Sequence, residues 1–91
     1  MKIQVIIYSR PGCHLCEEAR EAIRNAHCEE AYSLKEVNIE SDPELLARYK
    51  DDIPVITFDG MEVFRHRVKS DQFAKALMRV AGQPGNIEDD G

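Results

Sequence analysis

The sequence lacks any long hydrophobic run. Its apolar stretches are short, and none approaches the roughly 20 consecutive apolar residues that a membrane helix requires. The N-terminal segment MKIQVII carries one positive charge, but no small-residue cleavage site follows it, so we interpret it as a strand and not as a signal peptide. These absences predict a cytoplasmic protein with no membrane partner.

Basic residues are also few. The chain has 12 lysines and arginines against 17 aspartates and glutamates, which gives a net charge of -5. Sites for nucleic-acid backbones need clustered lysine and arginine. The nearest such cluster, residues 65–69 with the sequence RHRVK, is short, and we interpret it as a solvated loop. We therefore expect no nucleic-acid partner.

Cysteine occurs only three times, and two of the three form a close C-x-x-C pair, Cys13 and Cys16. In a cytoplasmic protein such a pair indicates redox or metal chemistry and not a structural disulfide. A bridge between the two would close a very small loop and would add little stability through chain entropy. Chemistry therefore explains the pair better than stability does, and we interpret the third thiol, Cys28, as passive.

Strand and helix patterns alternate along a chain long enough for one domain. Apolar spacing distinguishes strands, with short β-branched or alternating runs, from helices, where apolar residues recur every three or four positions. Strands are expected at residues 2–8, 32–39, 54–58 and 61–64, and helices at residues 13–27, 43–50 and 70–81. This order predicts an α/β fold with a mixed four-stranded sheet flanked by three helices. Residues 1–82 form the domain, and residues 83–91 are an acidic tail without fold content.

Three of these segments carry more specific signals. The sequence Asp59-Gly60 favours a type I′ hairpin turn, because that turn needs positive φ at both central residues. The apolar residues of the second strand change phase midway, which either a bulge or a late strand start near Lys35 would explain. Ser70 is expected to cap the last helix, Gly82 to stop it, and the helix to bury Phe73, Ala74, Leu77, Val80 and Ala81.

The position of Cys13 favours a thiolate, the species that attacks disulfides. Cys13 follows the strand-ending turn Pro11-Gly12 and opens a helix, so unpaired backbone N–H groups point toward its sulfur. Helix N-termini and nearby cations lower the pKa of a cysteine from about 8.5 to roughly 3.5–7.5, and Arg10 and His14 add positive charge here. Cys16 lies one helical turn further on, where it can attack a mixed disulfide on Cys13. We predict that Cys13 is the nucleophile and Cys16 the resolving thiol.

Two other functions would use the same cysteines. A structural zinc site needs two further ligands, and His27 and Cys28 lie about 20 Å away at the far end of the predicted helix. His66 alone is one ligand too few, so we expect no metal site. A metal or iron–sulfur binding module is the alternative function, and a fold retained only as an interaction domain is the third. We expect a monomer.

Residues 8–16, with the sequence YSRPGCHLC, resemble the active-site segment of glutaredoxins, and residues 53–55, IPV, resemble the cis-proline site of the thioredoxin superfamily. Together the motifs are most similar to a bacterial glutaredoxin-like family with a C-H-L-C motif, and the resemblance spans nearly the whole domain. It implies a thioredoxin-like fold in which Pro54 is cis and packs beside Cys13. It also implies that the backbone of Ile53 pairs with the extended chain of a substrate.

One segment departs from the glutaredoxin pattern. Glutaredoxins carry a Gly-Gly pair after the last strand, where glutathione approaches, whereas this chain has Arg65, His66 and Arg67 there. Their bulk could block glutathione, or their positive charge could attract its carboxylates. The resemblance therefore implies a dithiol oxidoreductase that reduces protein or low-molecular-weight disulfides. It implies an unidentified reductant and no tightly bound cofactor, with glutathione as a candidate co-substrate.

Overall fold

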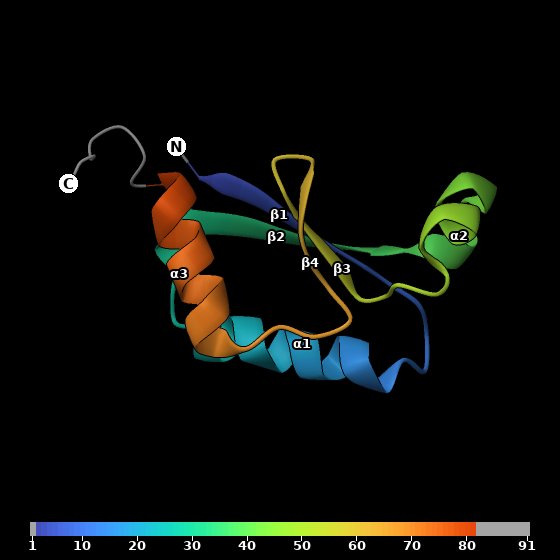
Figure 1. The fold of residues 1–91 in the computed structure, drawn as a ribbon, viewed down its shortest axis with the longest axis horizontal. Coiled ribbons are helices and arrows are strands. Elements are labelled where there is room, and N and C mark those ends of the chain that lie inside the picture. Colours follow the sequence, from blue (N-terminus) through green and yellow to red (C-terminus); the bar gives the residue numbers. More distant parts are fainter. Residues whose placement is uncertain (1, 82–91) are drawn as a thin grey trace.

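The computed structural model describes residues 2–81, which form four strands and three α-helices in the order βαβαββα (Figure 1). The strands are β1 (Ile3–Ser9), β2 (Tyr32–Asn38), β3 (Val55–Phe58) and β4 (Met61–Arg65), and the helices are α1 (His14–Asn25), α2 (Pro43–Tyr49) and α3 (Ser70–Ala81). Each expected element is present, with bounds that differ by at most two residues. The expected tail at residues 83–91 lies outside the described residues. No helix in the described part is long and apolar enough to cross a membrane.

The sheet has the strand order β2-β1-β3-β4. β1 and β2 pair in parallel, because α1 crosses over between them, and β3 pairs antiparallel with both β1 and β4. The β3–β4 turn has positive φ at Asp59 (50°) and at Gly60 (91°), as the Asp-Gly sequence predicts. The mixed four-stranded sheet with three helices is therefore confirmed.

Alternation along the strands places buried side chains on both faces of the sheet. The larger cluster is packed against α1 and α3, and its members include Ile3, Val5, Ile7, Ala19, Ile23, Phe58, Phe73 and Leu77. The smaller cluster, beneath α2, consists of Ile39, Tyr49 and Val55. In Figure 1, α3 and α2 stand at opposite ends of the sheet. Helices therefore pack on both faces of the sheet, and the loop between β1 and α1 lies at the edge of the sheet where β1 ends.

The phase change in β2 has neither of the two causes that the sequence suggests. β2 pairs with β1 without interruption from Tyr32 to Asn38, so a bulge or a late start near Lys35 is wrong. Instead, β2 is an edge strand, and Leu34 is 45% exposed although Tyr32, two residues earlier on the same face, is buried. Tyr32 packs against Phe73 of α3, whereas Ile39, directly after β2, packs with Tyr49 of α2.

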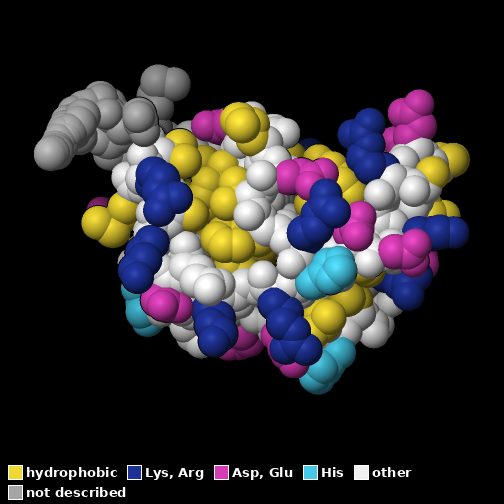
Figure 2. Space-filling view, in the orientation of Figure 1, with side chains coloured by type: hydrophobic (Ala, Val, Ile, Leu, Met, Phe, Trp, Pro, Cys, Tyr) yellow, Lys and Arg dark blue, Asp and Glu magenta, His cyan; other side chains and the backbone are white. Residues whose placement is uncertain are grey.

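α3 begins at Ser70, and one of its expected core residues is wrong, while the side chain of Ala81 lies outside the described part. Phe73 and Leu77 are buried, whereas Val80, in the last turn of the helix, is exposed. Apolar side chains are visible at the surface between α3 and the β3–β4 hairpin (Figure 2). The hydroxyl of Ser70 donates to the carbonyl of Ala22 in α1 at 2.7 Å. This hydrogen bond joins the two helices that cover the larger cluster.

Candidate active site

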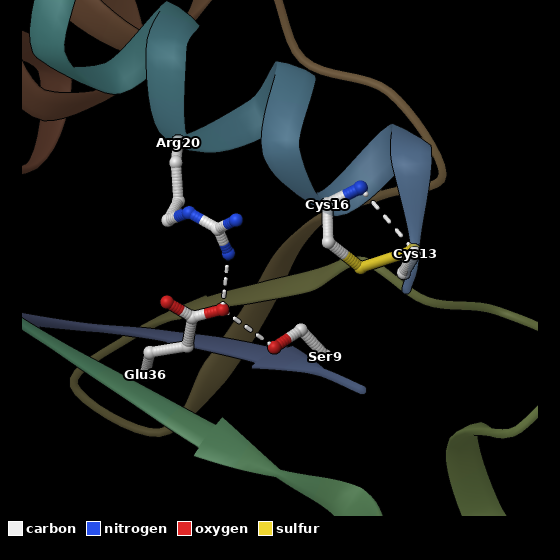
Figure 3. Close-up of polar contacts among 5 residues, drawn as sticks. All are labelled: Ser9, Cys13, Cys16, Arg20 and Glu36. Carbon is white, nitrogen blue, oxygen red and sulfur yellow. Dashed lines mark hydrogen bonds and ion pairs between the residues drawn. A yellow bond between two sulfur atoms is a disulfide. The ribbon is translucent and has the colours of Figure 1, made fainter. Parts of the chain in front are cut away.

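Cys13 and Cys16 lie where the chain passes from β1 into α1 (Figure 3). They are joined by a disulfide, and their Cα atoms are 5.3 Å apart. Cys13 is the N-cap of α1, and its Sγ accepts the backbone N–H of Cys16 at 3.2 Å. A hydrogen bond to a charged acceptor is stronger than one to a neutral acceptor. In the reduced protein this N–H therefore favours the thiolate of Cys13.

The two sulfur-bearing residues differ in exposure. Cys16 is 0% exposed, whereas Cys13 is partly exposed. Gly12, with a φ of 77°, lets the chain turn sharply before the helix. The backbone N–H of Cys13 donates to the carbonyl of Arg10 at 3.3 Å, which closes this turn. An incoming disulfide therefore meets Cys13 before it can meet Cys16.

The cations predicted beside Cys13 occupy different settings. Arg10 and Pro11 are exposed in the loop before Cys13. The ring of His14 is exposed, and its Nε2 lies 3.2 Å from a carboxylate oxygen of Glu18. The positive charge of a protonated His14 is therefore met by Glu18. Of the two predicted cations, Arg10 lines the hollow beside Cys13 and His14 does not. The supporting roles of Arg10, Pro11 and His14 stay predictions.

The peptide bond between Ile53 and Pro54 is cis, as the resemblance implies. Pro54 is buried, and its carbonyl accepts the backbone N–H of His66 at 2.8 Å. This hydrogen bond ties the proline loop before β3 to the segment that follows β4. The packing of Pro54 against Cys13 and the pairing of Ile53 with a substrate stay predictions.

Arg65 and His66 are engaged by carboxylates of this chain. The guanidinium of Arg65 lies 2.6 Å from Glu62 and 3.7 Å from Asp52, and the ring of His66 lies 3.5 Å from Asp52. The hydrogen bond with Glu62 and the charges of Glu62 and Asp52 raise the pKa of Arg65 above its ordinary value. The charge of Arg65 is therefore largely compensated before any ligand arrives.

A hollow of about 260 Å³ opens beside Cys13 and contains residues that the sequence analysis did not single out. Its lining includes Ser9, Arg20, Glu36 and Asn38. Glu36 and Asn38 lie toward the carboxyl end of β2, which is parallel to β1. The carboxyl ends of neighbouring parallel strands meet at one edge of a sheet, and this rule could have identified both residues from the sequence. Nothing in the sequence marks Arg20.

No group of three or more metal-binding side chains is present among residues 2–81. The thiol of Cys28 donates to the carbonyl of Ala26, at the other end of α1 from the disulfide. Cys28 therefore lies apart from the Cys13–Cys16 pair.

Comparisons with known proteins agree with this geometry. Residues 4–78 match the family model described as glutaredoxin-like domain (DUF836). A protein of Dictyostelium discoideum, named glutaredoxin-like protein YDR286C homolog, is 32% identical over 87 residues, which cover 89% of this chain and 81% of that protein. The resemblance carried by residues 8–16 and 53–55 is confirmed.

Solved structures share the fold. The X-ray structure of a structural genomics target from X. campestris is 28% identical with a TM-score of 0.68, covering 80% of this chain and 93% of its own. The solution NMR structure of a Nitrosomonas europaea protein is 28% identical with a TM-score of 0.72, and the match covers 85% of this chain and 93% of that one. Fasciola hepatica thioredoxin, 19% identical with a TM-score of 0.58 over 86% of this chain and 80% of that one, matches in fold alone. The thioredoxin-like fold is confirmed.

Proposed function

Because the chain belongs to the glutaredoxin-like domain family, we propose that it is a thiol–disulfide oxidoreductase that reduces protein or low-molecular-weight disulfides. The observation that carries the proposal is the unequal setting of the two sulfurs. Cys13 is partly exposed and accepts a helical N–H, whereas Cys16 is buried within disulfide reach. An exposed, stabilised thiolate suits attack on a disulfide, and an enclosed neighbour suits the second step.

The exchange proceeds in two displacements. In the reduced protein the Cys13 thiolate attacks one sulfur of the substrate disulfide R–S–S–R′. That S–S bond breaks, R′S⁻ leaves and takes a proton from solvent, and Cys13 is left in a mixed disulfide with R. Cys16 then loses its proton and attacks the Cys13 sulfur, which forms the intramolecular disulfide and releases RS⁻. Two electrons pass from the dithiol to the substrate, and a thiol reductant returns them.

Glutathione is the first reductant to test. A hollow of about 180 Å³ beside α1 has His66, Arg67 and Lys69 in its lining, together with Glu18, whose carboxylate pairs with His14. Arg67 and Lys69 have no ion pair within residues 2–81, so they are available for the carboxylates of glutathione. Arg65, by contrast, is already paired with Glu62 and Asp52.

Replacing each cysteine in turn tests the proposal. Cys13→Ser is expected to abolish disulfide reduction, because it removes the attacking sulfur. Cys16→Ser is expected to trap a mixed disulfide on Cys13, which mass spectrometry of the intact protein detects. Cys28→Ser is the matched control and is expected to keep full activity. Full activity of the Cys13→Ser variant would end the proposal.

The role of glutathione is tested separately. The Cys13–Cys16 pair is equilibrated against buffers of reduced and oxidised glutathione, and free thiols are alkylated and counted. This yields the reduction potential of the pair. A glutathione adduct on Cys13, most abundant in the Cys16→Ser variant, is expected. If no adduct forms while other disulfides are still reduced, a different reductant serves the protein.

A further inference from the structure

Glu36 is the centre of a polar network beside the disulfide (Figure 3). Its Oε2 accepts the hydroxyl of Ser9 at 2.7 Å and forms an ion pair with the Nη1 of Arg20. The three residues come from β2, β1 and α1. One carboxylate oxygen therefore joins the strand that enters the redox loop to the helix that leaves it.

The position of each partner relates the network to the cysteines. Ser9 is the last residue of β1, four residues before Cys13, and it is only 4% exposed. A buried hydroxyl without a partner is costly, so Ser9 needs the Glu36 oxygen. Arg20 follows Cys16 by four residues and so lies one turn further along the same side of α1. The side chains of Arg20 and Glu36 are 35% and 37% exposed, which screens their charges less than full exposure would.

Two cations and two anions line the hollow beside Cys13, and one of each belongs to the Arg20–Glu36 pair. The charged groups lining its hollow are Arg10, Glu17, Arg20 and Glu36. Elsewhere around the site, Glu18 meets His14, and Asp52 meets both Arg65 and His66. A carboxylate close to a thiolate disfavours it, and a guanidinium beside that carboxylate cancels the effect.

We propose that Arg20 and Glu36 form a compensated charge pair that sets how readily Cys13 becomes a thiolate. Glu36 holds Ser9 and the end of β1 in place, and Arg20 removes the electrostatic penalty that this carboxylate imposes on the Cys13 sulfur. Both are positioning residues and not catalytic ones. The inference deepens the proposed function and rests on it, since it concerns the reactivity of Cys13.

Charge-removing variants test the pair, made in a Cys28→Ser background so that only the two site thiols titrate. Glu36→Gln keeps an oxygen for Ser9 but removes the negative charge, so the pKa of Cys13 is expected to fall. Arg20→Gln leaves the carboxylate uncompensated, so that pKa is expected to rise. Each shift should be about 0.3–1 unit, which is roughly two- to tenfold in the ratio of thiolate to thiol.

Two further variants separate charge from shape. In the double variant E36Q/R20Q the pKa of Cys13 is expected to lie close to that of the parent protein. In Arg20→Lys, which keeps the positive charge, this pKa is also expected to stay close to the parent value. Arg24→Gln is the control, because Arg24 pairs with Glu21 one turn further along α1 and does not line the hollow of Cys13. The readouts are the pH dependence of thiolate absorbance and of the alkylation rate, and the reduction potential, which should rise in Glu36→Gln and fall in Arg20→Gln.

Shifts of opposite sign in the pKa of Cys13 in Glu36→Gln and Arg20→Gln support the proposed charge pair. Simple loosening of the loop would shift this pKa in the same direction in both variants. Shifts of the same sign, or shifts no larger than that of Arg24→Gln, overturn it. Alkylation needs no disulfide substrate, so the pair is tested even if exchange fails. If the pKa of Cys13 is unchanged in the variants while the protein still reduces disulfides, only the charge-pair proposal is rejected. If the parent protein reduces no disulfide, the proposed function is rejected.

Discussion

Cys13 and Cys16 show how far neighbouring residues of one type can differ. They are separated by one helical turn, yet one is partly exposed at the helix N-cap and the other is fully buried. The difference follows from the helix axis. The N-cap lies at the rim of the sheet, and the residue three positions later points back toward the core. The different roles proposed for these two identical side chains therefore rest on their positions alone.

Thr57 carries a buried hydroxyl group whose hydrogen bonding is not satisfied among the described residues. It lies in β3 between two neighbouring strands and is 2% exposed, and its Oγ1 has no hydrogen-bond partner in the part of the chain that the structure describes. Thr57→Val removes the hydroxyl and keeps the shape, so it is expected to raise the free energy of unfolding by about 1 kcal/mol. Urea unfolding measures this. Thr57→Ser, which keeps the hydroxyl and loses a methyl group, is the control and is expected to be less stable than the parent. A Thr57→Val protein less stable than the parent would contradict the prediction.

At the scale of elements, the β3–β4 hairpin depends on its turn. Asp59 and Gly60 both have positive φ, and the turn is also tied to β1. The backbone N–H of Gln4 donates to the Asp59 carboxylate at 2.9 Å, and the N–H of Asp59 donates to the Gln4 carbonyl at 2.8 Å. The hairpin is thus held in register with the strand that leads to Cys13.

Gly60→Ala tests this turn. A Cβ at position 60 would meet no atom within 4 Å, so the cost comes from the backbone φ of 91° and not from a clash. The variant is expected to lose about 1 kcal/mol of unfolding free energy. Gly60→Asn is the matched comparison, because asparagine tolerates positive φ better, and it should lose less. Thermal or urea unfolding of the two variants checks the order, and an alanine variant as stable as the parent would show that the turn is not strained.

At the scale of the whole molecule, Tyr32 links the edge of the sheet to the helical layer. It starts β2, is buried, and packs edge-to-face on Phe73 of α3 with ring centroids 5.4 Å apart. Burial raises the pKa of Tyr32 above its ordinary value of 10.0, and Glu29 and Cys28 nearby raise it further. The folded protein therefore holds the phenol neutral at a pH where the unfolded chain releases its proton.

This shift gives stability a defined pH dependence. Below pH 10 both states keep the phenol proton, and Tyr32 adds no pH dependence. Above about pH 10 the unfolded chain binds fewer protons, so the free energy of unfolding falls as the pH rises. Tyr32→Phe lacks this proton. The urea midpoint of Tyr32→Phe minus that of the parent is therefore expected to increase from about pH 8 to about pH 11, because only the parent loses stability through Tyr32 ionisation. A difference between the two proteins that stays constant over this range would show that ionisation of Tyr32 is not coupled to folding.

The sequence by itself determined the features that depend on near neighbours. The elements, the Asp-Gly turn and the placement of Cys13 at a helix start each follow from a few consecutive residues, because backbone preferences and capping act over one or two turns. The cis form of Pro54 was implied by the resemblance of residues 53–55 to a family motif and not by local backbone preference. These parts of the fold and of the candidate site are therefore predictable from the sequence.

The tertiary structure alone decided what distant residues do to one another. Ser9, Arg20 and Glu36 meet because β1 and β2 pair in one particular register and α1 packs across them. Arg65 forms ion pairs with Glu62 and Asp52 of the same chain. Leu34 stays exposed because β2 lies at the edge of the sheet. No local preference encodes such contacts, since they depend on which strands pair and in which register. The cysteines that carry the proposed chemistry, and Arg10 next to them, were therefore visible in the sequence, whereas the Arg20–Glu36 pair beside them was not.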